Sequence, residues 1–525
     1  MQCIRAQHQC PGYRDACELN FRNQTDDVIR KATRQSPSKP IQAFVWRTKQ
    51  QPTSRVVLAS GSEKSRRQAP RAVSLNKIQL QQALALIIPC SIMQPVEAQA
   101  TGFFLSSYVL GSHFDYLPSL YRLTGMNELL SAGIHAVGLA ILSNEFNSSD
   151  LLKKSRKWYS QTLHLTNLAL SSPCGVTDDS NLVAVMLLSL YEFITCRSQL
   201  PMTAWTDHIN GATELIRLRG RQQLRTPLGL ELFTQMTDNI FVSCVQREVS
   251  VPSNIIALRA HAANLVDGSC PAWRFSDIVV RYTSFRAAIK NGNLSDPDSI
   301  IACAMKIDSD LSVWSKTLPL QWKYDTVFTD TDPELVYEGY FHVYHDHRIA
   351  QILNSFRMNR ILLHQLINDR VVQRMSASRP SLISPDYTAL AQLSLETMLK
   401  MTSDICASVP QFTASAPSFL SPTSKLQASH SSSSIPLSVT SRRKSETLQP
   451  GARHPYLAQH SDPFRVAGGY FLLWPLFMVS SLAVSPNSLR LWVINRLYFI
   501  GSSMKIPQAL LVARILEGKE SVDSW

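Results

Sequence analysis

The sequence has little glycine and few charged residues for its length. Glycine accounts for 19 of the 525 residues, and Asp, Glu, Lys and Arg together make up 17%. Hydrophobic residues reach 45% and aromatic residues 8%, which is enough to bury a large core. These proportions exclude a chain that is disordered throughout, and the scarcity of glycine favours helices over a turn-rich sandwich.

Two features of secreted proteins are also missing. Residues 1–20 are polar and lack the apolar stretch of a signal peptide. After residue 17 the cysteines are scattered, so they do not form the framework of a disulfide-rich scaffold. We therefore expect a cytosolic or nuclear protein in which Cys196 and Cys244, both in apolar runs, are small core residues.

Motifs of common catalytic sites are absent as well. The sequence has no nucleophile elbow, no phosphate-cradling glycine loop and no His-Glu-x-x-His pattern. His342, His345 and His347 lie close together, but on a helix His347 would point about 160° away from His345. We interpret these histidines as a solvated helix face instead of a metal site, and we do not expect an enzyme.

The positive charge is concentrated near the N-terminus. Residues 1–80 hold fifteen Lys or Arg and five Asp or Glu, so they carry most of the net charge of +13. A basic arm before a near-neutral body suits contact with nucleic acid or nuclear import. A solvated, disordered tail would have the same charge pattern, so both interpretations stay open.

Apolar residues recur at helical spacing after residue 78, and strand-like alternation is nearly absent. Trp205, Ile209, Ala212 and Ile216, for example, would form a stripe on one helix face. The sequence therefore predicts an all-α fold, a helical array. The expected helices are residues 78–89, 103–121, 127–143, 150–171, 180–197, 204–219, 228–246, 297–317, 334–368 and 388–408.

Composition divides the chain into three parts. Residues 1–17 hold the clustered cysteines, and residues 18–77 are basic, contain Pro, Ser and Gln, and show no sustained period, as in a largely disordered linker. Residues 78–525 form the helical domain. Within it, residues 409–455 are rich in Ser, Pro and Thr and can bury little, so we expect a disordered insertion there.

One apolar stretch is long enough to span a bilayer. Residues 466–484 carry no charge, but they include Pro475 and the pair Gly468 and Gly469, and no second span accompanies them. We interpret the stretch as a core helix of a large helical domain and expect no membrane association; a membrane-spanning helix is the competing hypothesis.

The opening residues carry the spacing of zinc ligands. Cys3 and Cys10 enclose six residues, and Pro-Gly-Tyr-Arg-Asp follows at once. This resembles the end of the fungal Zn2Cys6 cluster, in which six thiolates hold two zinc ions in tetrahedral sulfur coordination. The resemblance implies that Cys3 and Cys10 are zinc ligands and that the other four ligands, with the helix that reads DNA, would lie before Met1.

A mononuclear zinc site is the alternative at this end of the chain. Cys3, Cys10 and Cys17, with His8 as a fourth ligand, would formally suffice for one tetrahedral site. No known motif has this spacing. The competing interpretation is that the thiols are free in a disordered terminus.

The body of the chain resembles the fungal-specific transcription factor domain, over most of residues 78–517. The segments that carry this resemblance are residues 114–117 (Phe-Asp-Tyr-Leu), 187–192 (Leu-Leu-Ser-Leu-Tyr-Glu), 215–220 (Leu-Ile-Arg-Leu-Arg-Gly), 336–344, 469–476 (Gly-Tyr-Phe-Leu-Leu-Trp-Pro-Leu) and 508–511. Single residues in these blocks have simpler roles. We expect Trp205 and Trp474 to be core aromatics, His208 to be a satisfied polar residue between helices, and Arg219 with Gly220 to end a helix.

The resemblance implies a nuclear regulator of transcription, such as those that control metabolic or biosynthetic gene clusters. Its cofactor would be zinc, provided that the first half of the cluster is present, and its partners would be DNA and a second copy or other regulatory proteins. The chain as given would bind DNA weakly, through its basic arm. The alternative is a truncated co-regulator or dominant-negative module that does not bind DNA itself.

Overall fold

The structure is a computed structural model that describes residues 95–109, 112–123, 127–195, 201–330, 333–377, 385–413 and 465–519. The described residues from Glu97 onward belong to one compact unit. The unit Gln24–Val96 is described only at its last two residues. The elements expected at residues 78–89, the linker and the cysteine-rich end therefore lie outside the described part of the chain.

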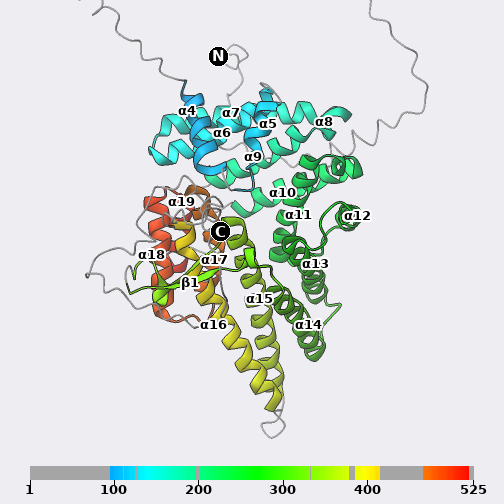
Figure 1. The fold of residues 1–525 in the computed structure, drawn as a ribbon, viewed down its shortest axis with the longest axis vertical. Coiled ribbons are helices and arrows are strands. Elements are labelled where there is room, and N and C mark those ends of the chain that lie inside the picture. The colour runs from blue at the N-terminus through cyan, green and yellow to red at the C-terminus, as the bar shows by residue number, and fades with distance from the viewer. Residues whose placement is uncertain are drawn as a thin grey trace, which may run out of the picture. The chain divides into compact units, whose positions relative to one another are not determined.

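The first half of the described chain is a succession of helices (Figure 1). They are α4 (Val96–Phe104), the π-turn η2 (Leu105–Val109), α5 (Leu117–Leu123), α6 (Glu128–Glu145), α7 (Ser149–Leu170), α8 (Pro173–Thr177), α9 (Asp179–Thr195), α10 (Pro201–Arg219), the 3-10 turn η3 (Gly220–Arg225) and α11 (Pro227–Arg247).

The second half adds longer helices and one small hairpin (Figure 1). Its elements are α12 (Ser253–Ala262), α13 (Pro271–Lys290), α14 (Pro297–Lys316), η4 (Leu320–Trp322), β1 (Asp325–Phe328), η5 (Tyr337–Gly339), β2 (Tyr340–Val343), α15 (His347–Ala377), α16 (Pro385–Thr413), α17 (Arg465–Ser481), α18 (Asn487–Ser503) and α19 (Pro507–Leu516). The prediction of an all-α fold is confirmed.

Capping residues explain where many of these helices begin. The side chains of Asn127, Ser148, Thr226 and Asp296 each accept a hydrogen bond from a backbone N–H in the first turn of the helix that follows. Proline occupies the first turn of several helices, where its missing N–H costs nothing and its fixed φ suits the helix. Local sequence therefore determines where many of these helices begin.

The prediction of one continuous helix over residues 103–121 is wrong, because the chain leaves the helical conformation between η2 and α5. After the π-turn η2, the chain bends before α5 begins at Leu117. The Ser112 hydroxyl donates to the Val109 carbonyl at 2.8 Å and accepts from the Phe114 N–H at 3.1 Å. A serine that satisfies nearby backbone groups in this way competes with helical hydrogen bonding and favours a turn.

The helix expected over residues 334–368 begins only at His347, and a hairpin precedes it. β1 and β2 pair antiparallel with Asp325 opposite Val343 and Phe328 opposite Tyr340. Glu338 and Gly339 have φ values of 55° and 72°, a conformation that ends any helix there. Phe341 and His342 in β2 are buried, which makes this short strand part of the interior.

The helix α16 extends further than expected and shortens the proposed insertion. It runs through Thr413 and buries Val409 and Phe412, although we had placed the start of the insertion at residue 409. α17 packs beside its end, and a Cβ at Gly468 would lie 2.8 Å from the Phe412 carbonyl oxygen. Glycine is needed at residue 468 because the two backbones touch there.

The apolar stretch at residues 466–484 forms α17 and the turn after it. Leu472, Leu473 and Leu476 are buried among other helices, whereas Trp474 is only half-buried. Among the described residues, no helix is both long and apolar enough to cross a bilayer.

Candidate functional site

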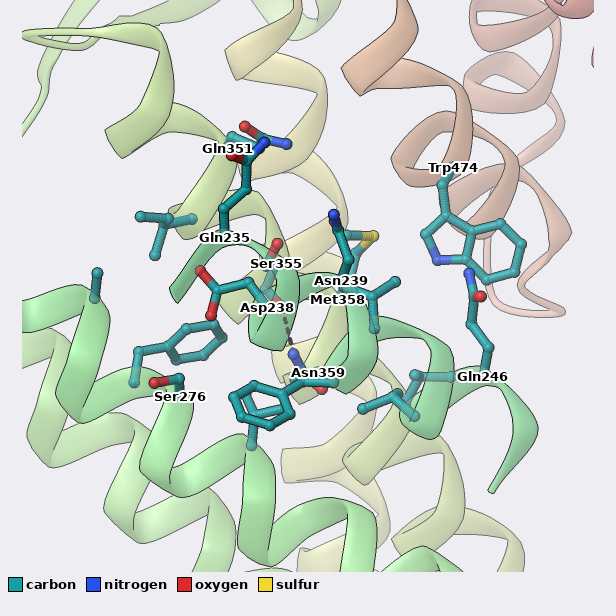
Figure 2. Close-up of a pocket in the computed structure, with 18 of the residues that line it drawn as sticks. Gln235, Asp238, Asn239, Gln246, Ser276, Gln351, Ser355, Met358, Asn359 and Trp474 are labelled. Carbon is teal, nitrogen blue, oxygen red and sulfur yellow. Dashed lines mark hydrogen bonds between the residues drawn. The ribbon is translucent and has the colours of Figure 1, made fainter. Parts of the chain in front are cut away.

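A cavity of about 380 Å³ lies between four helices that are far apart in the sequence (Figure 2). Its walls come from α11, α13, α15 and α17, with His113 from the bend before α5. Cavities that hold drug-sized molecules begin at about 300 Å³ and are mostly apolar with a few placed polar groups. The cavity fits both descriptions, so it is the candidate functional site.

One face of α11 supplies a large part of the wall. Gln235, Asp238, Val242, Val245 and Gln246 all line the cavity. Their spacing of three, four, three and one residues places them on one side of a helix. This face is more polar than a core face, which is the signal in the sequence that could have located the site.

The remaining walls are mainly apolar. Phe241 and Phe275 line the cavity from α11 and α13, Met358 lines it from α15, and Trp474 and Met478 line it from α17. The prediction that Trp474 is a core aromatic is therefore wrong in part, because its indole is half-buried and lines the cavity (Figure 2). An aromatic ring in such a position offers a ligand a flat apolar surface.

Several polar atoms around the cavity have no partner. Among the residues that the structure describes, Gln235 Oε1, Gln246 Oε1 and Asn359 Oδ1 are buried and accept no hydrogen bond. The side-chain N–H of Asn359, by contrast, donates to the Ser355 carbonyl at 2.8 Å (Figure 2). A buried polar atom without a partner costs roughly 1–3 kcal/mol, so such atoms mark places where a donor would bind favourably.

Among the described residues that line the inner cavity, Asp238 is the one with a carboxylate. Its side chain is accessible, but the surface that it exposes faces the cavity, and no described residue forms a hydrogen bond with it. Burial by the surrounding protein raises the pKa of Asp238 to about 7, and the charge of Arg259 opposes this shift only in part. The group therefore changes charge near neutral pH.

We predict that Asp238→Asn stabilises the protein at pH 8. The raised pKa means that the folded state binds the proton more tightly, so the wild-type chain gains stability as the pH falls from about 7 to about 4. Because the carboxylate is accessible, solvent screens part of this effect. We therefore expect Asp238→Asn to raise the free energy of unfolding by about 1 kcal/mol at pH 8 and to leave it unchanged near pH 4. Urea titrations at the two pH values measure it.

The control is Asp150→Asn, because Asp150 is exposed and pairs with Lys153 on the surface of α7. This variant is expected to leave the free energy of unfolding unchanged at both pH values. A loss of stability in Asp238→Asn at pH 8 would contradict the proposed environment of the carboxylate.

A wider chamber of about 810 Å³ adjoins the cavity and shares His113, Gln235, Asp238, Ala272 and Ile352 with it. Glu231, one turn before Gln235 on α11, lies in its wall. The pKa of Glu231 is raised by burial and by the charge of Asp115, and Arg348 opposes the shift.

The three clustered histidines do not share a helix face. His342 lies in β2 with its Nδ1 3.0 Å from the Tyr344 hydroxyl, and His347 begins α15 with Nε2 3.0 Å from the Gln411 carbonyl. His345 is exposed, as expected. Burial, together with the charges of Arg357 and Lys400, lowers the pKa of His342 to about 3, so it is a neutral core residue and not a solvated one.

The other singled-out residues have structural roles. His208 is buried 3.1 Å from Glu192, as expected for a satisfied polar residue between helices. Gly220 follows the end of α10 with a φ of 56°, also as expected. The Arg219 guanidinium, however, reaches the Asp178 carbonyl at 2.8 Å and the Asp179 carboxylate, so it joins α10 to the start of α9.

Cys244 is a buried core residue, as predicted. The side chain of Trp205 and the residues Cys196, Cys3 and Cys10 lie outside what the structure describes. Among the described residues, no group of His, Cys, Asp and Glu side chains could hold a metal ion.

Comparison with known proteins identifies one part of the chain. Residues 112–244 match the family described as "Fungal specific transcription factor domain". No curated protein and no solved structure matches the chain. The match includes the segments at residues 114–117, 187–192 and 215–220, and it ends within α11, after the residues Gln235 to Val242 of the cavity wall. It supports a role in the regulation of transcription and points away from an enzyme.

Proposed function

We propose that this chain is a nuclear regulator of transcription that acts through its helical domain and controls a metabolic or biosynthetic gene cluster. The observation that carries the proposal is the match of residues 112–244 to the fungal-specific transcription factor domain. The basic arm of residues 1–80 supports it, since such an arm suits nuclear import and contact with DNA phosphates. A second copy or other regulatory proteins would be its partners.

Zinc would belong to the region before the helical domain. Cys3 and Cys10 supply two thiols with the spacing of a Zn2Cys6 cluster. Two thiolates do not complete the tetrahedral coordination of even one zinc ion, so these residues alone do not fit a cluster. We therefore assign no DNA-reading step to zinc.

The family match lies wholly within the helical domain, which also suits a second function of the same class. In it, the chain is a co-regulator or dominant-negative module that binds other regulators through the helical domain and does not read DNA itself. The two functions differ in how the chain reaches its genes.

A tethering experiment tests the shared proposal. The full chain is fused to an unrelated DNA-binding domain and placed above a reporter gene, with the DNA-binding domain alone as the control. We expect the fusion to change transcription of the reporter in either direction, because a regulatory domain acts once it is brought to a promoter. Unchanged reporter output at matched protein abundance would contradict a regulatory role.

Titration of the untethered chain with duplex DNA separates the two functions. Contact through the basic arm alone would be independent of sequence and would weaken steeply between about 50 and 200 mM salt, because bound counterions are released. Binding that prefers one sequence and withstands salt would instead identify a DNA-reading regulator.

A further inference from the structure

The cavity and the adjoining chamber contain more negative than positive charge. Glu231 and Asp238 stand on α11, seven residues and therefore about 10 Å apart along the helix axis. Both line the wider chamber, and Asp238 also lines the inner cavity. Neither carboxylate forms an ion pair or hydrogen bond with any described residue, and burial raises the pKa of both.

The arginines around the cavity do not balance these two charges, because each already has its own carboxylate. Their ion pairs are Arg259 with Asp277, Arg286 with Glu248, and Arg348 with Asp115. His113 does not balance them either: burial and the charge of Arg348 lower its pKa, which keeps it neutral. Asp346 in the wider chamber already has a partner, since its carboxylate accepts a hydrogen bond from the Ile349 N–H at the start of α15.

The inner cavity offers a place for an apolar body next to Asp238. Phe241, Phe275 and Trp474 supply aromatic surface, and Met358 and Met478 supply flexible thioether side chains that adapt to the shape of a guest. The unpartnered Gln235 Oε1 and Asn359 Oδ1 are acceptors without donors. Acceptors and carboxylates therefore surround the polar end. Among the described residues that line the inner cavity, Arg286 Nε is a buried donor without a hydrogen-bond partner, but its guanidinium already pairs with Glu248.

We propose that this cavity binds an organic cation, with an aromatic or aliphatic body in the inner cavity and a protonated amine at Asp238. An ammonium group would give the carboxylate its missing partner and could donate to Gln235. An anion would meet two unpaired carboxylates, and a neutral molecule would leave Asp238 unpaired, so both are disfavoured. The inference does not depend on the role in transcription, because binding is measured on the isolated protein.

Cation binding should strengthen as the pH rises from about 6 to about 8. Over this interval Asp238, whose pKa is raised to about 7, loses its proton, and the ionised fraction grows about tenfold. Glu231, with its raised pKa, acts in the same direction, and His113, with its lowered pKa, stays neutral. The other charged groups around the cavity are held in ion pairs; they are Arg259, Asp277, Arg286, Glu248, Arg348 and Asp115. His345 and Asp346 line the wider chamber and not the inner cavity.

Three anthracene probes with the same ring test the proposal on the full chain. They are 9-(methylaminomethyl)anthracene, which is a cation, 9-anthracenemethanol, which is neutral, and 9-anthracenecarboxylate, which is an anion. Their fluorescence and the quenching of the protein's tryptophans report binding. We expect the amine to bind about tenfold more tightly than the alcohol at pH 8, and the carboxylate to bind weakest.

Two variants locate the binding. Asp238→Asn should weaken the amine about tenfold, leave the alcohol unchanged and reduce the pH dependence to the part that Glu231 contributes. Ala272→Trp should block all three probes, because Ala272 lines both the cavity and the chamber. The matched controls are Asp150→Asn, on the surface of α7, and Ala263→Trp, at the exposed end of α12.

Equal affinity for the three probes, or tighter binding of the carboxylate, would overturn the proposal. So would a preference for the amine that persists in Asp238→Asn or in Ala272→Trp, since the cation would then bind elsewhere.

Discussion

Replacement of Trp314 by alanine is expected to lower the free energy of unfolding by about 3–5 kcal/mol. Trp314 is only 2% exposed and its ring lies against Phe275 from α13 and Phe356 from α15, with ring centroids 5.1 and 5.3 Å away. Its indole N–H also donates to the Pro271 carbonyl at 2.9 Å. The variant would lose the packing of three helices and the hydrogen bond to the partly buried Pro271 carbonyl.

Urea denaturation followed by circular dichroism measures this loss, with two controls on the same helix. Trp314→Phe keeps an aromatic ring but gives up the hydrogen bond, so it should cost about 1–2 kcal/mol. Val313→Ala changes the next residue, which is 53% exposed, and should cost less than about 0.5 kcal/mol. A similar stability for Trp314→Ala and Val313→Ala would mean that α14 does not pack in this way. Because Phe275 lines the cavity, Trp314→Ala should also weaken the binding of the anthracene amine.

Asp308→Asn is expected to destabilise the protein by about 3 kcal/mol at pH 7. Asp308 on α14 accepts two hydrogen bonds from Arg360 on α15, at 2.6 and 2.9 Å, and lies 3.2 Å from His364 Nε2. The side chains of all three residues are at most 15% exposed. Removal of the charge would leave a buried guanidinium without its counterion, which is far costlier than the loss of a surface pair.

The lowered pKa of Asp308 agrees with a contribution of this size. Burial alone would raise this pKa, but hydrogen bonds from His364 and Arg360 and the charge of Arg360 together lower it from 3.8 to about 2. That shift corresponds to about 2.5 kcal/mol. Because the pKa is lowered in the folded state, the contribution is present above about pH 4 and is lost as the pH falls to about 2.

This pH dependence is measured by urea denaturation of the wild-type chain and of Asp308→Asn at pH 7 and at pH 3. The difference between their free energies of unfolding should be smaller at pH 3. Asp310→Asn is the matched control, since Asp310 lies one half-turn along the same helix and its ion pair with Arg281 is exposed. It should cost less than about 1 kcal/mol. Equal effects of the two changes would show that the Asp308 pair is not buried as described.

Local sequence was sufficient to predict most of the helices. α6, α7, α9, α11 and α14 lie within a few residues of their expected positions, because apolar periodicity, N-caps and first-turn prolines are all local signals. The hairpin was missed because four-residue strands are too short to show a period, and because Glu338 adopts a positive φ that no local rule anticipates. In β2, burial of His342 depends on Tyr324 and Tyr344, which pack around it.

The cavity could not be predicted from one sequence, although the sequence does show the polar face of α11 that forms part of its wall. Gln235, Asp238 and Gln246 are polar residues at helical spacing, and such a face ordinarily meets solvent. It encloses a cavity here because α13, α15 and α17 bring Phe275, Met358 and Trp474 opposite it from distant parts of the chain. The environment that raises the pKa of Asp238 is therefore a tertiary property.

The contact between Phe412 and Gly468 also bears on how this protein can change over evolution. The segment between Thr413 and Arg465 leaves and rejoins the helical body at two points that the structure holds together, where α16 meets α17. When the ends of a segment are fixed in this way, doubling its length adds only about 0.6 kcal/mol of closure entropy. Residues can thus be gained or lost at this junction with little effect on the core, which makes it a permissive site for sequence divergence and for the insertion of a fluorescent or affinity tag.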